Sequence, residues 1–184
     1  MKAKVNKVKI EIVMDDLLGL AVSGIVNPTD TNLTLPDRLQ KRAGPSLQAA
    51  CEEIVWCPVG SAVITPAGNL PCSHIIHAVG PRWGEGSERG KLVSVVLRCL
   101  DLAEEHGLKS LAMPPISTGA MGFPLESCAR VMLSEIIDFT FEDLKHLRTV
   151  LVVVSDALEL DTFNIEFARL IEMLQSSGEG KVRV

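Results

Sequence analysis

The chain has 184 residues, of which 47% are hydrophobic and 22% charged, and its formal net charge is −5. This length can bury a substantial core without disulfides or metals, so we expect one domain over residues 1–184, with its core over about 7–175 and a polar tail over 176–184. An acidic chain lacks the basic stripe that phosphate-backbone binding needs, which argues against general nucleic-acid binding.

The five cysteines are scattered through apolar segments, and no two of them have the C-x-x-C spacing of a zinc or redox site. Reduced core thiols are the favoured interpretation, and we predict no metal site and no cofactor. No signal-peptide-like apolar segment follows the lysine-rich N-terminus, and no apolar run approaches the roughly 20 residues needed to cross a bilayer. We therefore expect a soluble cytoplasmic protein without a membrane partner, and the oligomeric state stays open.

The first part of the chain predicts short strands separated by polar turns. Residues 7–14 alternate between apolar and charged side chains, which indicates a half-buried strand of the edge type. A second strand is predicted over 23–26, followed by a polar turn over 27–32. Two helices, over 37–42 and 45–53, are expected next, because each begins at or beside a proline and a glycine separates them.

Two polar features of this region have both a structural and a functional interpretation. Asp15 and Asp16 follow the first predicted strand, where one carboxylate can cap the next turn. At the carboxyl edge of an α/β sheet the same carboxylate can instead accept a hydrogen bond from an exocyclic amine of a ligand. The basic cluster Arg38, Lys41 and Arg42 is most simply a solvated helix face.

The middle of the chain predicts two further strands, over 61–65 and 73–79. His77 has apolar neighbours in the second of these, so we interpret it as a hydrogen-bonded core histidine and not as a catalytic base. In the glycine-rich surface loop that follows, Trp83 is expected to cover apolar surface. Apolar residues at helical spacing then predict an amphipathic helix over 91–105.

The stretch from residue 108 to residue 139 has the order strand, glycine-containing loop and helix. The predicted strand covers 108–113 and the predicted helix 124–139, with Gly119 and Gly122 in the loop between them. This order places backbone N–H groups and a helix N-terminus at one end of a sheet, where they can hold an anion. The spacing matches neither the P-loop nor the Rossmann fingerprint, so nucleotide hydrolysis of the P-loop kind is not indicated.

The last part of the chain completes an α/β pattern. The apolar run over 148–154 predicts a strand buried on both faces, as in the centre of a parallel sheet. A final helix is predicted over 162–174, and the tail over 176–184 is either frayed or a short edge strand. The alternation of strands and helices indicates a three-layer α/β/α sandwich with a mixed, largely parallel central sheet.

Four segments, in this order along the chain, closely resemble the macrodomain family. They are Ile25–Asp30, Pro66–Pro71, Ile75–Pro81 and Ile116–Pro124. The resemblance implies an α/β/α fold that binds ADP-ribose or a related NAD-derived metabolite, free or on an ADP-ribosylated protein. Some members of the family hydrolyse ADP-ribosyl conjugates or O-acetyl-ADP-ribose, or process ADP-ribose-1″-phosphate.

The resemblance also implies a role for individual residues. Asp16 is similar to the aspartate that receives the adenine amine, Asn27 to the first asparagine of the family's Asn-Ala-Ala-Asn, and Phe123 to a residue near the distal ribose. The end of the last predicted strand, at Ser155, resembles the part of the family's pocket wall that lies beside the adenine. The loop over 117–123 resembles the one that wraps the diphosphate. The implied ligand-binding residues are Asp16, Leu17, Asn27, Asp30, Ser117, Thr118, Gly119, Ala120, Met121, Gly122, Phe123 and Ser155.

Departures from the family pattern leave the activity open. Asp30 replaces the second asparagine, and a shorter segment over 34–37 replaces the family's glycine-rich loop. These changes favour a binding module over an enzyme. The alternative is a hydrolase in which Asp30 or Asp37 activates a water molecule. A third possibility is a macrodomain fold whose pocket has lost its original ligand.

Overall fold

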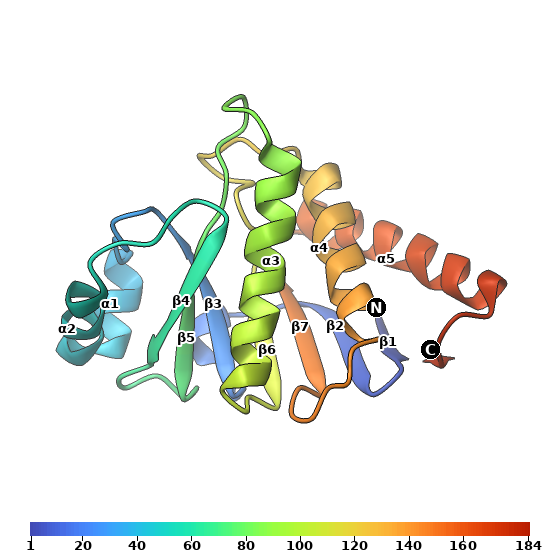
Figure 1. Cartoon of the computed structure of the whole chain (residues 1–184), viewed down its shortest axis with the longest axis horizontal. Helices are drawn as coiled ribbons and strands as arrows, with labels where there is room; N and C mark the ends of the chain where they lie inside the picture. Colours follow the sequence, from blue (N-terminus) through green and yellow to red (C-terminus); the bar gives the residue numbers. More distant parts are fainter.

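The computed structural model describes residues 1–184 and contains one eight-stranded sheet flanked by helices (Figure 1). Its strands are β1 (Lys2–Val5), β2 (Val8–Met14), β3 (Gly24–Thr29), β4 (Ser61–Pro66), β5 (His74–Val79), β6 (Ser110–Met113), β7 (Thr149–Val154) and β8 (Val182–Arg183). Its helices are η1 (Leu17–Gly19), α1 (Asp37–Ala43), α2 (Pro45–Ile54), α3 (Glu88–Glu105), α4 (Leu125–Phe139) and α5 (Ala157–Ser177).

The strand order is β4-β5-β3-β6-β7-β2-β1-β8. Strands β5, β3, β6, β7 and β2 are parallel, whereas β4, β1 and β8 run antiparallel to their neighbours. The carboxyl ends of the parallel strands therefore meet at one edge of the sheet, which lies at the top of Figure 1. This arrangement brings the loops after β3, β5 and β6 together, although they are far apart in the sequence.

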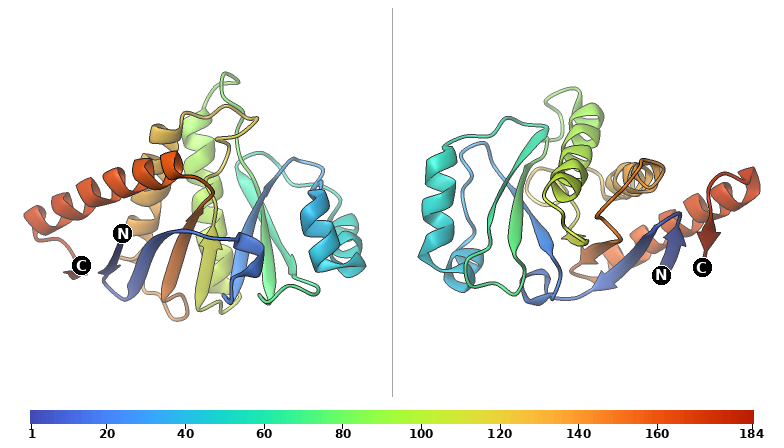
Figure 2. Two further views of the ribbon diagram at one scale, coloured as in Figure 1. Left: turned by 180° about the vertical axis from the view of Figure 1, so that it is seen from behind. Right: turned by 60° about the horizontal axis from the view of Figure 1, so that its bottom comes forward.

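Helices cover the two faces of the sheet unequally. The larger core joins one sheet face to α3, α4 and α5, and includes Val95, Met132 and Phe163. The smaller core joins the other face to α1 and α2 through residues such as Leu39 and Leu47. Figure 2 shows α1 and α2 at the end of the sheet that carries β4 and β5, away from β1 and β8. The predicted three-layer α/β/α fold is confirmed.

Strand β2 is not at the edge of the sheet, so that part of the prediction was wrong. It lies between β7 and β1, and β1 was not predicted at all. Residues 2–5 alternate in the same way as β2, and a turn at Asn6 (φ 54°) folds the two strands into a hairpin. Within the predicted tail, Val182 and Arg183 form the edge strand β8, which was one of the two alternatives, and α5 extends through Ser177.

Strand β3 continues through residues for which a polar turn was predicted. Asn27, Pro28 and Thr29 extend the parallel ladder with β5, opposite His77, Ala78 and Val79. Strand β6 pairs only with Gly24 and Ile25, so no ladder partner on that side requires the missing N–H of Pro28. The polar turn therefore begins at Asp30, at the carboxyl edge of the sheet.

The last helix is longer than the predicted 162–174. The Asp156 side chain accepts a hydrogen bond from the N–H of Glu159 at 2.8 Å and caps α5, which begins at Ala157. Leu160 in the first turn packs against the larger core together with Phe163 and Phe167, at helical spacing, so the predicted start at 162 was too late. None of the helices is long and apolar enough to cross a membrane.

Candidate functional site

A cavity of about 300 Å³ opens at the carboxyl edge of the sheet. It lies where the loops after β3, β5 and β6 meet. Its walls are Pro28, Thr29, Asp30, Gly80, Pro115, Ile116, Ser117, Thr118, Gly119, Ala120 and Met121. The structure thus places six of the predicted site residues around one space, namely Asp30 and the run 117–121.

The loop between β6 and α4 lines this cavity and contains unpaired backbone N–H groups. The N–H of Phe123 donates to the carbonyl of Ser117 at 2.9 Å, and that of Gly122 donates to Gly119 at 3.0 Å. These two bonds close the loop around residues 118–121, whose own N–H groups have no acceptor within the chain. A run of free amides in a turn forms an anion-binding concavity without any lysine or arginine.

Close packing of Gly80 against Ser117 and Ile116 fixes the start of the loop. Ser117 is buried with φ 66°, in the left-handed region that non-glycine residues seldom adopt. A Cβ atom at Gly80 would lie 2.2 Å from the Ser117 Oγ atom and 2.6 Å from Ile116, so only glycine fits there. A Cβ atom at Gly119 would meet nothing within 4 Å. The glycine after β5 therefore supports the loop, whereas Gly119 faces open space.

Asp30 adds a fixed negative charge to the wall. Its Oδ1 atom accepts hydrogen bonds from the N–H groups of Asn32 at 3.0 Å and Thr34 at 3.1 Å. Burial raises the pKa of this carboxyl, but the hydrogen bonds from Thr34 and Asn32 outweigh that effect and lower its pKa overall. Asp30 is therefore an ionised hydrogen-bond acceptor at neutral pH and cannot donate as an amide would.

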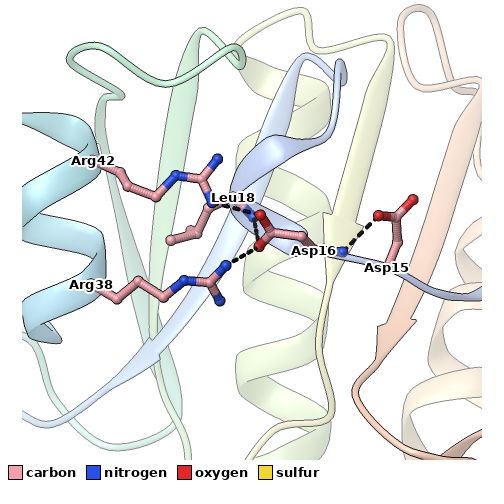
Figure 3. A network of polar contacts seen from close by, with 5 residues as sticks. All are labelled: Asp15, Asp16, Leu18, Arg38 and Arg42. Carbon is pink, nitrogen blue, oxygen red and sulfur yellow. Dashed lines mark hydrogen bonds and ion pairs between the residues drawn. The ribbon is translucent and has the colours of Figure 1, made fainter.

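Asp16 lies outside this cavity and is held by two arginines of α1 (Figure 3). Its Oδ1 atom accepts a hydrogen bond from Arg38 at 2.9 Å and its Oδ2 atom accepts one from Arg42 at 2.6 Å. The hydrogen bond from Arg42 is the largest cause that lowers the pKa of Asp16. The basic cluster is thus not simply a solvated helix face, since only Lys41 of the three is left without a salt bridge to an acid.

The structure shows the capping interpretation of the two aspartates, and the contact with a ligand amine stays a prediction. Asp15 accepts a hydrogen bond from the N–H of Asp16, and Asp16 accepts one from the N–H of Leu18 at 3.3 Å, so they cap the turn into η1. The Asp16 side chain is nevertheless 39% exposed. Its position just after β2 puts it at the same edge of the sheet as the cavity.

Asn27 points away from the cavity and into the smaller core. Its Nδ2 amide donates to Nδ1 of His77 at 3.1 Å, and Nε2 of His77 lies 2.8 Å from Thr65 Oγ1. Because the amide is a donor, Nδ1 of His77 is the acceptor and Nε2 carries the proton. His77 is fully buried, as predicted, and burial lowers its pKa to about 4.

The remaining predicted residues lie around the site but not in its wall. Phe123 is buried and packs edge to face against Trp83, with ring centroids 5.2 Å apart. Ser155 is exposed, and its hydroxyl donates to Oε2 of Glu159 at 3.0 Å. Leu17 is half-buried in η1.

Two further predicted residues lie in a loop and at a helix start. Gly122 turns the loop with φ 76°. Asp37 is exposed in the first turn of α1, so the structure does not bring it to the cavity beside Asp30.

Several wall residues were not among the predicted site residues. Gly80 could have been found because it follows directly on the apolar strand β5, at the edge where ligands bind in α/β sheets. Pro28 and Thr29 lay within a segment interpreted as a local turn, and no sequence signal shows that their strand ends against the loop at 115–121. That proximity arises only from the order β5-β3-β6 in the sheet.

Comparisons with known proteins bear on this site. A model of the Macro domain family matches residues 26–132. The chain is 40% identical to the O-acetyl-ADP-ribose deacetylase of Escherichia fergusonii over 143 residues, which cover 72% of this chain and 81% of that protein. It is 34% identical over 165 residues to O-acetyl-ADP-ribose deacetylase 2 of Pantoea vagans, covering 84% of this chain and 96% of the relative.

Solved structures agree with the sequence relatives. The Oceanobacillus iheyensis macrodomain with ADP is similar with a TM-score of 0.88 and 30% identity, covering 94% of this chain and 97% of that one. A mutant of the same macrodomain with ADPR has a TM-score of 0.86 and 29% identity over 94% of this chain and 98% of that one. The bound molecules in these two structures are ADP and ADPR, respectively.

Proposed function

Because this chain belongs to the macrodomain family, we propose that it binds ADP-ribose, free or attached to a protein, at the carboxyl edge of the sheet. The observation that carries the proposal is the run of unpaired N–H groups over 118–121, which faces a cavity of about 300 Å³. Backbone amides suit a diphosphate, and their use explains how an acidic chain can hold an anion. Relatives and solved neighbours named for ADP-ribose compounds support the same ligand.

In this proposal the adenine lies toward Asp16 and the distal ribose toward Asp30. The Asp16 carboxylate is ionised and partly exposed, so it can accept a hydrogen bond from the adenine amine beside those from its arginines. Asp30 can accept ribose hydroxyls, although its charge opposes the nearby phosphates. Isothermal titration calorimetry with ADP-ribose tests the proposal, and a chain that produces no binding heat would contradict it.

The role of Asp16 can be separated from its ion pairs with α1. We expect Asp16→Ala to weaken ADP-ribose binding about 10- to 100-fold, the loss of a charge-assisted hydrogen bond worth roughly 1.5–3 kcal/mol. The control Arg38→Ala/Arg42→Ala removes both ion pairs but keeps the carboxylate, and we expect it to bind ADP-ribose within a few-fold of the parent. Equal losses in the two variants would show that Asp16 acts only through α1, and would contradict the adenine assignment.

A second candidate function is hydrolysis of O-acetyl-ADP-ribose, which the names of the relatives favour. Asp30 is the ionised carboxylate in the cavity wall and is the candidate to orient or activate water. Incubation with O-acetyl-ADP-ribose, followed by mass spectrometry of the products, distinguishes a hydrolase from a binding module. Product formation supports the hydrolase, and bound but unchanged ligand supports the binding module.

If the chain is a hydrolase, Asp30→Asn should lower its turnover by at least about 10-fold, because a positioned base contributes about 10²–10⁴ to rate. The asparagine keeps an oxygen acceptor for the N–H groups of Asn32 and Thr34, so the loop should keep its shape. Its ADP-ribose affinity should hold or rise, since a negative charge is removed. Asp37→Asn is measured in parallel, and a loss of turnover there but not at position 30 would contradict the assignment.

A location in the cytoplasm and a single-domain organisation also remain proposals. All five cysteines are free and buried, which suits a reducing compartment. Fractionation of cells that produce the tagged chain would test the location, and limited proteolysis would test the domain organisation.

A further inference from the structure

One half of the sheet has a face that no helix covers, and this face is strongly basic. The apolar side chains of β1 and β2, such as Val5 and Ile10, point into the larger core beneath α3, α4 and α5. Helices α1 and α2 cover the second face only at the opposite end of the sheet, as the two views of Figure 2 show. Val13 near the end of β2 still packs against the smaller core, but the second face is open to solvent where it carries Lys4, Lys9 and Arg183.

This open face contains a concavity of about 420 Å³ that we call the basic face. It is lined by Lys2, Lys4, Lys7, Lys9, Arg148 and Arg183, with Ala3 and Val184. These are six of the 18 basic residues in a chain whose net charge is −5. The one acid paired with them is Glu11, whose Oε2 atom lies 2.6 Å from Nζ of Lys9.

The strand register places like charges directly opposite one another. Lys4 on β1 faces Lys9 on β2, and on its other side it faces Arg183 on β8. Like charges in directly opposed positions destabilise a sheet, and this row has three of them across adjacent strands. The row is assembled from both ends of the chain. A bound polyanion would neutralise it, whereas water alone leaves the repulsion in place.

We propose that the basic face binds the phosphate backbone of nucleic acid, without preference for base sequence. Nucleic-acid interfaces are much more positively charged than protein interfaces, whose centres are depleted in lysine and built on aromatic anchors. The basic face has lysines and no aromatic side chain. Its concave shape and its lack of large apolar residues also distinguish it from a surface that lies on a membrane.

The side chains of the basic face also explain why the binding is independent of the base sequence. Lysine contacts phosphate as a point charge, and contacts with phosphate carry no sequence information. Arg148 donates to the carbonyls of Leu144, Lys145 and Leu147, so its guanidinium is a fixed charge at the margin of the face. This proposal departs from the expectation based on net charge, because folding gathers cations that are dispersed in the sequence. It does not depend on the ADP-ribose site.

The test is a fluorescence-anisotropy titration of the full chain with a labelled oligouridylate of about 15 nucleotides, at about 50 mM and about 200 mM salt. We expect binding that weakens steeply with salt. Lys4→Glu/Arg183→Glu should reduce the affinity at low salt by at least about 10-fold and flatten the salt slope by about 1.4, which is two phosphate contacts at about 0.7 each. Lys4→Gln/Arg183→Gln should give an intermediate loss.

The control Lys41→Glu/Lys91→Glu makes the same change in net charge outside the basic face, and should bind the oligonucleotide within about three-fold of the parent. Because the reversed charges relieve repulsion with Lys9, Lys4→Glu should also raise the melting temperature. All variants should bind ADP-ribose as the parent does. Three results would overturn the proposal: no oligonucleotide binding at low salt, an equal loss in the control, or binding to anionic vesicles of phosphatidylglycerol without binding to the oligonucleotide.

Discussion

Gly119→Glu is expected to weaken ADP-ribose binding by about 100-fold without disturbing the fold. A side chain at this position meets no atom within 4 Å of its Cβ, and Gly119 does not have a positive φ, so the glutamate can be accommodated. Its carboxylate would lie beside the free N–H groups over 118–121 and could occupy them in place of the ligand. It would also repel the diphosphate. For two charges about 5 Å apart at an effective dielectric constant of about 20, the repulsion is about 3 kcal/mol, which lowers the ADP-ribose affinity about 100-fold.

The matched control is Gly119→Ala, which adds the same Cβ without a charge. We expect it to bind ADP-ribose within about three-fold of the parent, because the space around the Cβ atom is open. Calorimetric titration of both variants, with a thermal melt of each, is the measurement. Unaltered binding by the glutamate variant would remove the loop from the site. An equal loss in the alanine variant would indicate a steric effect and contradict the electrostatic account.

The second large effect is a loss of stability in mild acid caused by His77. Its pKa is about 4 in the folded chain, against about 6.5 in the unfolded chain, so the unfolded state takes up the proton first as the pH falls. The stability that the neutral histidine contributes is complete above pH 6.5 and is lost as the pH falls from 6.5 toward about 4. The free energy of unfolding falls by about 2 kcal/mol at about pH 5 and by about 3 kcal/mol at about pH 4.

Urea unfolding at about pH 7, 6 and 5 measures this effect before most carboxylates titrate. His77→Gln can keep both hydrogen bonds, with the amide oxygen facing Asn27 and the amide nitrogen facing Thr65, but it cannot take up a proton. We therefore expect the variant to lose much less stability between pH 7 and 5 than the parent does. A parent whose midpoint does not move over this range would contradict the assignment of His77 as a neutral buried group.

The fold was largely predictable because its elements have strong local signals. The helix α3 has apolar side chains at helical spacing, and β7 is a continuous apolar run of the kind that a central parallel strand needs. The edges were less predictable. Residues 2–5 show only two periods of alternation, and the sequence does not indicate that β1 and β8 pair with each other beyond β2.

The candidate site was also predictable only in part. The loop over 117–122 could be located because strand, glycine and helix signals follow one another within a short stretch. The contacts of Asp16 with Arg38 and Arg42 could not, since they depend on how α1 packs beside η1. The orientation of Asn27 toward His77 also depends on the parallel register of β3 and β5, which the sequence does not specify. Residue types and short motifs could be read from the sequence, whereas contacts between distant segments could not.

The most direct test of the central claim is a titration of the ¹⁵N-labelled chain with ADP-ribose, followed by amide NMR. We expect the N–H signals of Thr118, Gly119, Ala120 and Met121 to shift most, because these residues line the cavity and their N–H groups have no acceptor in the chain. Smaller shifts are expected at Asp16 and Asp30. Binding that leaves these four amides unchanged, or that shifts only residues of the basic face, would contradict it.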